Sequence, residues 1–281
     1  MAHEEKTLYI ADLDGTLLNE NAELSAYTKA ALAQMIAEGI HFSVATGRTA
    51  ATASRILEDI AWNIPVVLFS GVLVYDMQAQ RYLRVISLPV EAVREIIEVL
   101  QRLHMTGLMY QLKDGAQTTY YETQLHQPIR DFMEERRVRY NKPFQEVTSF
   151  ADVPLEEIVF FTLLDAYEKI EQAEAALKGI AGIELSISQN VYQPELWYLE
   201  IHGDQASKKN GVHYLKEKYG FQKVIGFGDN LNDLPLFAAC DTAVAVKNAR
   251  EEVKAAADDV CEANVADGVV KWIFAHHTKS K

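Results

Sequence analysis

The sequence predicts an α/β protein in which a doubly wound, parallel-sheet domain carries an inserted α+β domain. Two observations predict this fold class. In the first and last thirds of the 281 residues, short apolar stretches alternate with amphipathic stretches, and this rhythm is typical of β-α-β units in a parallel sheet. The middle third instead combines helical stretches with a hairpin signal at Lys113-Asp114-Gly115, which is typical of antiparallel strands.

The parallel-sheet pattern occurs at both ends of the chain. In the first third we expect strands at 7–13, 41–45 and 65–69 and helices at 26–38 and 50–59. In the last third we expect helices at 209–219, 233–239 and 265–276 and strands at 224–227 and 242–246. Because the two ends repeat the same alternation, we predict that residues 1–82 and 191–281 form one domain.

The inserted domain is predicted to comprise residues 83–190. Within it we expect helices at 90–103, 129–137 and 167–177 and strands at 108–112, 118–122, 158–164 and 184–188. Further short strands are expected beside its two boundaries, at 72–75, 82–86 and 197–201. Helices mixed with antiparallel strands in this order indicate an α+β arrangement.

Composition excludes several classes of function. A formal net charge of -13 and a pI near 5.1 argue against a nucleic-acid partner, because binding to a phosphate backbone depends on clustered Lys and Arg. The longest nearly apolar stretch, 64–75, is broken by Pro65 and Gly71 and is shorter than the roughly 20 residues of a membrane-spanning helix. The polar start of the chain lacks a secretion signal, and Cys240 and Cys261 form no paired spacing, so we expect a cytoplasmic protein without membrane partners.

The clearest chemical signal is Asp12-Leu13-Asp14-Gly15-Thr16-Leu17, at the end of the first predicted strand. In open parallel sheets, ligands bind beyond the carboxyl ends of the strands. Two acids placed two apart on an extended backbone point to opposite sides, so one can attack or bind metal while the other handles protons. An Asp-Gly turn by itself would explain Asp14 and Gly15 but not Asp12.

A second acidic signal, Gly226-Phe227-Gly228-Asp229-Asn230-Leu231-Asn232-Asp233, stands at the end of the predicted strand 224–227. Asp229 is expected at the strand tip, with Asp233 one helical turn further on. Oxygen ligands from Asp12, the backbone carbonyl of Asp14 and Asp229, completed by waters, suit octahedral Mg²⁺. We therefore predict a magnesium site. Taken alone, this segment could also be a loop that caps the following helix.

Two weaker motifs complete the set. Thr46-Gly47-Arg48 follows the predicted strand 41–45, and a hydroxyl followed by a glycine amide can bind phosphate. Ser207-Lys208-Lys209 opens the helix after the insert, where one ammonium group would offset the charge of a phosphoryl group and of the aspartates. Either motif alone is equally compatible with an ordinary turn or a solvated helix start.

These four motifs, in this order and interrupted by a large α+β insert, resemble the haloacid dehalogenase superfamily, and in particular its Cof-like phosphatases with a type-two cap. The resemblance covers essentially the whole chain. It implies a Rossmann-like core, with Asp12 as nucleophile, Asp14 as general acid and base, and Lys208 as partner of the phosphate and the nucleophile. It further implies Thr46 as a phosphate ligand, Asp229 as a Mg²⁺ ligand, and Asn232 and Asp233 as supporting residues of the metal site. Asp12, Asp14, Asp229 and Asp233 are accordingly the predicted metal-site residues, and Thr46, Gly47, Arg48, Ser70, Gly71 and Asn232 the predicted phosphate- or substrate-binding residues.

The sequence departs from the family pattern in two places. Phe69-Ser70-Gly71-Val72 stands where the family often has Ser-Asn-Gly-Ala, so Ser70 replaces an amide that would line the site. Lys209 stands where family members usually have Gly. Lys208 is therefore the better match to the family lysine.

The resulting hypothesis is a Mg²⁺-dependent phosphatase that cleaves a small phosphorylated metabolite, such as a sugar phosphate, through an aspartyl-phosphate. Two alternatives remain at this stage, a phosphosugar mutase and a non-catalytic phosphosugar-binding protein. A complete set of nucleophile, acid and lysine argues against the binding protein. The sequence fixes neither the substrate nor the oligomeric state.

Overall fold

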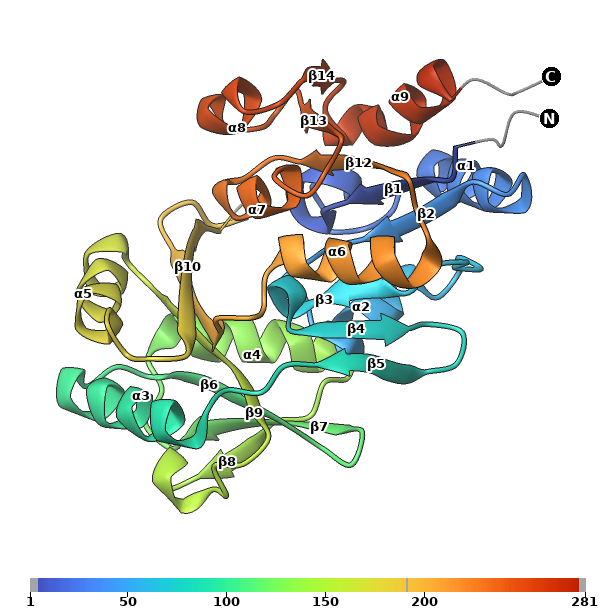
Figure 1. Cartoon of the computed structure of the whole chain (residues 1–281). Coiled ribbons are helices and arrows are strands. Elements are labelled where there is room, and N and C mark those ends of the chain that lie inside the picture. The colour runs from blue at the N-terminus through green and yellow to red at the C-terminus, as the bar shows by residue number, and fades with distance from the viewer. Residues whose placement is uncertain (1–4, 191, 278–281) are drawn as a thin grey trace. The chain divides into compact units, whose positions relative to one another are not determined.

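A computed structural model describes residues 5–190 and 192–277 of the chain, which divides into two compact units (Figure 1). Unit 1 comprises Met1–Leu83 and Ser207–Lys281, and unit 2 comprises Arg84–Ala206. The chain therefore leaves unit 1 once, completes unit 2, and returns.

Unit 1 is built on a parallel sheet with the strand order β14-β13-β12-β1-β2. Its strands are β1 (Thr7–Ala11), β2 (His41–Val44), β12 (Lys223–Gly228), β13 (Thr242–Val246) and β14 (Asp259–Cys261). A parallel bridge from Ala45 to Val67 connects it to a smaller sheet of β3 (Val66–Leu68), β4 (Leu73–Asp76) and β5 (Arg81–Val85). β1 lies between β12 and β2, so segments from both ends of the chain meet at its tip.

The helices of unit 1 cover both faces of this sheet. They are α1 (Ala26–Ala37), α2 (Ala50–Leu57), α6 (Lys208–Tyr219), α7 (Leu234–Phe237), α8 (Glu251–Ala255) and α9 (Gly268–His276). Leu8, Tyr9, Ile10 and Ala11 are all buried although their side chains alternate between faces. Burial of consecutive residues is typical of parallel strands covered on both sides, and the fold is the expected doubly wound α/β core.

Unit 2 is an α+β structure with the strand order β10-β11-β9-β6-β7-β8. The strands are β6 (Gly107–Lys113), β7 (Ala116–Glu122), β8 (Gln145–Val147), β9 (Ile158–Asp165), β10 (Ile183–Gln189) and β11 (Trp197–Gly203). Its helices are α3 (Val90–Leu103), α4 (Gln127–Tyr140) and α5 (Tyr167–Leu177). All neighbouring strands are antiparallel except β7 and β8.

The second boundary between the units lies at 206/207, whereas the sequence places it at 190/191. The first boundary, at 83/84, differs from the expected 82/83 by one residue. The shift has a specific cause: β11 pairs with both β10 and β9, so it belongs to the sheet of unit 2. Its sequence pattern shows a strand but not the sheet that the strand joins.

Several elements of unit 1 are shorter than expected or were not expected. α7 begins only at Leu234, because a short 3-10 helix, Leu231–Asp233, precedes it. α9 begins at Gly268, after Asp267 adopts a left-handed conformation with φ 58°. α8 and β14 in unit 1, and β8 in unit 2, are short elements that the pattern of the sequence did not indicate. Across the described ranges 5–190 and 192–277, no helix has the length and apolar character that crossing a bilayer requires.

The hydrophobic core of unit 2 gives the first testable prediction. Phe161 on β9 is fully buried and packs edge-to-face on Phe150. Phe161→Ala should lower the free energy of unfolding by about 3–5 kcal/mol, because it removes buried area and leaves a cavity. Val138→Ala, at a residue that is 79% exposed, should change it by less than about 0.5 kcal/mol. Urea denaturation followed by circular dichroism measures both, and equal shifts would contradict the described core.

Candidate active site

The polar motifs stand at the carboxyl ends of adjacent strands in unit 1. Asp12 follows β1 and Asp229 follows β12, and these strands pair in parallel with Ala11 opposite Phe227. The backbone N–H of Asp12 donates to the carbonyl of Phe227 at 3.0 Å. The parallel register therefore brings two segments from opposite ends of the chain to one edge of the sheet.

A tight turn after Asp12 brings the first motif against the second. Asp14 (φ -74°, ψ 119°) and Gly15 (φ 81°, ψ -9°) have the backbone angles of a type II turn, which requires a positive φ at its second central residue. A Cβ at Gly15 would also lie 2.4 Å from Oδ2 of Asp229. Glycine is therefore needed here both for its backbone angle and for the close approach. Thr16 then donates from Oγ1 to Oδ1 of Asp229 at 2.7 Å.

Three buried carboxylates form a cluster at this edge. Asp12, Asp229 and Asp233 each offer one oxygen, and these oxygens lie within 4.8 Å of one another. The buried ammonium of Lys208 donates to Oδ1 of Asp12 at 2.7 Å and to Oδ1 of Asp233 at 2.6 Å. Lys209 is exposed, so the structure singles out Lys208 as the lysine of the cluster.

Burial and mutual repulsion shift the titration of this cluster. Burial, with smaller contributions from Asp233 and Asp14, raises the pKa of Asp12 to about 7 even though Lys208 opposes the shift. Burial and the charges of Asp233 and Asp12 raise the pKa of Asp229 well above its ordinary value. Burial would lower the pKa of Lys208, but its attraction to Asp12 and Asp233 outweighs burial and raises that pKa. Three carboxylates thus compete for one ammonium group.

Asp233 holds the second motif in shape. Its Oδ2 accepts from the backbone N–H groups of Asp229 and Asn230 at 2.9 and 3.1 Å, as part of a capping box, while its Oδ1 accepts from Lys208. Both oxygens are therefore engaged within the protein. Asn232, half-buried, lies next to Asp233 in the same turn.

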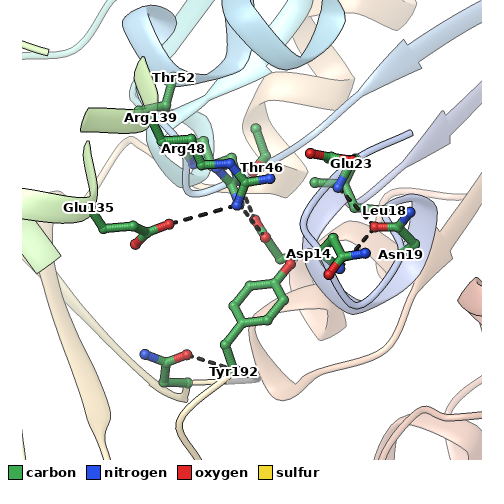
Figure 2. A network of polar contacts seen from close by, with 12 residues as sticks. Asp14, Leu18, Asn19, Glu23, Thr46, Arg48, Thr52, Glu135, Arg139 and Tyr192 are labelled. Carbon is green, nitrogen blue, oxygen red and sulfur yellow. Dashed lines mark hydrogen bonds and ion pairs between the residues drawn. The ribbon is translucent and has the colours of Figure 1, made fainter. Parts of the chain in front are cut away.

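Asp14 lies in a separate environment from Asp12. The Arg48 guanidinium donates from Nε to Oδ2 and from Nη2 to Oδ1 of Asp14, both at 2.6 Å (Figure 2). Such bidentate pairs are strong and fix the geometry of the carboxylate. The sequence predicted that the two acids have different environments, but it did not predict that Arg48 contacts Asp14.

The remaining predicted residues surround the tips of β2 and β3. Thr46 is buried, and its Oγ1 accepts from the backbone N–H of Arg48 at 3.1 Å; Gly47 between them is half-buried. Ser70, with φ 52°, donates from its backbone N–H to the carbonyl of Thr46 at 3.0 Å. The next residue is Gly71, with φ 104°, and a Cβ there would lie 1.9 Å from the carbonyl oxygen of Ser207.

All of the predicted site residues therefore lie at one end of unit 1, on the tips of β1, β2, β3 and β12 and the start of α6. Two contacts were not predicted. The Thr16 hydroxyl was expected near the site, but not that it donates to Asp229, and Asn248, whose Nδ2 donates to the carbonyl of Gly15 at 2.7 Å, was not expected there. Asn248 follows β13. Its place after a further parallel strand is the signal that could have drawn attention to it.

Comparison with known proteins agrees with this arrangement. A family model described as haloacid dehalogenase-like hydrolase matches residues 9–273, and the chain belongs to this family. The pyridoxal phosphate phosphatase YbhA of Escherichia coli (strain K12) is 26% identical over 274 residues, which cover 94% of this chain and 96% of that protein. The 5-amino-6-(5-phospho-D-ribitylamino)uracil phosphatase YitU of Bacillus subtilis (strain 168) is 24% identical over 277 residues, covering 96% and 97%.

The fold agrees as well. The subclass IIB sugar phosphatase BT4131 has a similar structure, with a TM-score of 0.75 and 19% identity over 97% of this chain and 99% of that one. The α+β unit 2 thus corresponds to a type-two cap, and the expected resemblance to Cof-like phosphatases is confirmed. The chain is a hydrolase of the phosphatase type.

The position of Lys208 gives a second prediction. Lys208→Met keeps most of the side-chain volume but leaves Asp12 and Asp233 buried without a cation, and breaking a buried ion pair in this way costs about 3–5 kcal/mol. Lys209→Met, at an exposed position, should change the free energy of unfolding by less than about 0.5 kcal/mol. Urea titrations at neutral pH compare the two variants. Equal losses would mean that Lys208 does not neutralise the cluster.

The raised pKa of Asp12 gives a third prediction, for protein freed of metal by a chelator. A folded-state pKa near 7 against an ordinary 3.8 means that folding favours the protonated acid, so Asp12 increasingly destabilises the fold as the pH rises from about 4 to about 7. Asn at this position stays neutral. Asp12→Asn should therefore gain stability relative to the wild type as the pH rises from about 4 to about 7, and the difference should level off at higher pH, as measured by thermal denaturation. A stability difference that is constant with pH would refute the shift.

Proposed function

We propose that this protein is a Mg²⁺-dependent phosphatase that hydrolyses a small phosphorylated metabolite through an aspartyl-phosphate formed on Asp12. The observation that carries the proposal is the Asp12 carboxylate at the tip of β1, bound by the buried Lys208 and grouped with Asp229 and Asp233. A carboxylate of this kind is a competent nucleophile toward phosphorus. The separate position of Asp14 beside Arg48 supplies a second acid for proton transfer.

The proposed reaction has two steps. In the first, an oxygen of Asp12 forms a bond to phosphorus, the bond from phosphorus to the ester oxygen breaks, and Asp14 gives its proton to the departing alcohol. In the second, Asp14 takes a proton from water as the water oxygen attacks phosphorus and the bond to Asp12 breaks, which releases inorganic phosphate. Asp14 thereby alternates between acid and base.

The acidic cluster fits a divalent cation. Burial, and then repulsion among the three carboxylates, raises the pKa values of Asp12 and Asp229, and a hard cation would offset the excess negative charge. We assign Asp12, Asp229 and the Asp14 backbone carbonyl as ligands, with Asp233, whose oxygens are engaged by Lys208 and backbone N–H groups, in a supporting position. When bound, Mg²⁺ would neutralise charge on the transferring phosphoryl oxygens.

The loops at the tips of β2 and β3 are proposed to bind the phosphoryl group. They contribute Thr46, Gly47, Arg48, Ser70 and Gly71, and Asn232 is proposed to contribute from the second motif. Arg48 now holds both oxygens of Asp14. Because guanidinium also binds phosphate in a bidentate manner, an incoming phosphoryl group would compete for Arg48 and release Asp14 for proton transfer.

The substrate is proposed to be a small metabolite, with sugar phosphates as the first class to test. Two relatives are named as phosphatases of pyridoxal phosphate and of a phosphoribitylamino-uracil, and one structural neighbour is named as a sugar phosphatase. We propose that unit 2, rather than the phosphoryl site, selects the substrate; the range of substrates named for these proteins supports this assignment. The acidic composition and the two free cysteines favour a cytoplasmic enzyme with no nucleic-acid or membrane partner.

The fourth prediction tests this function directly. Purified protein should hydrolyse p-nitrophenyl phosphate and members of a panel of sugar phosphates and pyridoxal phosphate in the presence of Mg²⁺, and EDTA should abolish the activity. Asp12→Asn should lose essentially all turnover because the amide keeps the shape of the carboxylate but not its nucleophilicity. Asp14→Asn should reduce kcat by about 10²–10⁴-fold.

Asp59→Asn is the matched control, because it makes the same chemical change at an exposed carboxylate of unit 1; it should retain wild-type kcat. Ordinary turnover by Asp12→Asn would overturn the aspartyl-phosphate mechanism. Activity that required a hexose bisphosphate would instead indicate a mutase. Binding of sugar phosphates without turnover of any panel member would indicate a binding protein.

A further inference from the structure

A third loop of unit 1 contacts both aspartate-bearing loops. It comprises residues 247–250 and follows β13, next to β12 in the sheet. Asn248 donates from Nδ2 to the carbonyl of Gly15 at 2.7 Å, and the backbone N–H of Arg250 donates to the carbonyl of Asp229 at 3.0 Å. One short segment thus connects the turn after Asp12 to the tip of β12.

Both polar atoms of the Asn248 side chain form hydrogen bonds. Its Oδ1 accepts from the backbone N–H of Asn264 at 3.0 Å, and its Nδ2 donates to the carbonyl of Gly15. These partners fix the orientation of the amide, because a carbonyl can only accept and an N–H can only donate. The Asn264 side chain in turn donates from Nδ2 to the carbonyl of Leu18 at 2.8 Å, so the turn is held at two points.

The bond to Gly15 matters because of the turn type. A type II turn differs from type I chiefly by rotation of the peptide that joins its two central residues, here Asp14 and Gly15. The direction of the Asp14 carbonyl therefore depends on keeping Asp14 near ψ 119° and Gly15 near φ 81°. Asn248 binds the carbonyl of Gly15 itself, and so holds in place the peptide that follows the one carrying the Asp14 carbonyl.

We propose that Asn248 is a positioning residue that holds the turn so that the Asp14 backbone carbonyl stays available to a divalent cation. The inference rests on the proposed function, which assigns this carbonyl as a ligand. Within the described part of the chain, the side-chain hydrogen bonds of Asn248 reach Gly15 and Asn264 and not the carboxylate cluster. Asn248 therefore acts through Gly15. Partners that orient metal ligands in this way typically contribute 10–100-fold to metal affinity or activity.

The experiment measures binding of Mg²⁺ alone by calorimetry, without substrate. Asn248→Ala removes the bond to Gly15, and because Asn248 is itself exposed the change leaves no buried cavity. Asn63→Ala is the matched control: its Nδ2 donates to the carbonyl of Ile40 at 2.8 Å, a part-buried bond of the same kind in the same unit. We expect Asn248→Ala to raise the Kd for Mg²⁺ by about 10-fold or more and Asn63→Ala to leave it unchanged.

A second measurement separates positioning from general stability. Asn248→Ala loses two side-chain to backbone bonds and Asn63→Ala loses one, so both variants should lower the urea midpoint, but only Asn248→Ala should need more Mg²⁺ to reach its full kcat. An unchanged Kd in Asn248→Ala, or an equal rise in Asn63→Ala, overturns the inference and leaves the proposed function intact. Failure of the wild type to bind Mg²⁺ would overturn the proposed function itself.

Discussion

The organisation of unit 1 depends on one electrostatic constraint: three buried carboxylates share a single buried ammonium. Lys208 reaches both Asp12 and Asp233, yet burial and repulsion still raise the pKa values of Asp12 and Asp229. Excess negative charge in a low-dielectric site destabilises the fold. Such charge is therefore found mainly at functional sites. The function proposed above would use this charge, with Asp12 as the nucleophile and the cluster as the place for a cation at the same sheet edge.

The backbone around the cluster follows from the same constraint. Carboxylates this close require loops that approach closely, and Gly15 and Gly71 occur where a Cβ would collide with Asp229 and with Ser207. Asp233 uses both oxygens to hold Lys208 and the N–H groups of its own turn. Each loop is therefore shaped by the charge it carries and not only by the sheet beneath it.

The two acids of the first motif, Asp12 and Asp14, have different cationic partners. Asp12 faces Lys208, whereas Asp14 is held by the guanidinium of Arg48. In the proposed two-step phosphoryl transfer, this separation would let Asp12 act as the nucleophile while Asp14 alternates between acid and base. Asp14 and Gly15 are the central residues of the type II turn that follows Asp12, so the position of Asp14 depends on the positive φ of Gly15.

The sequence by itself determined the fold class, the insertion and the residues of the four motifs. Apolar stretches that alternate with amphipathic stretches indicate parallel strands, and residues that directly follow such strands lie at the edge of the sheet where ligands bind. Only the tertiary structure decided that β11 belongs to unit 2, that Arg48 binds Asp14, that Lys208 also binds Asp233, and that Asn248 holds Gly15. The physical reason is the separation of the partners along the sequence: Lys208 lies 196 residues from Asp12, and Asn248 lies 233 residues from Gly15. Local pattern reveals the direction of a side chain along its own strand or helix, but the partner it meets is set by strand order and register.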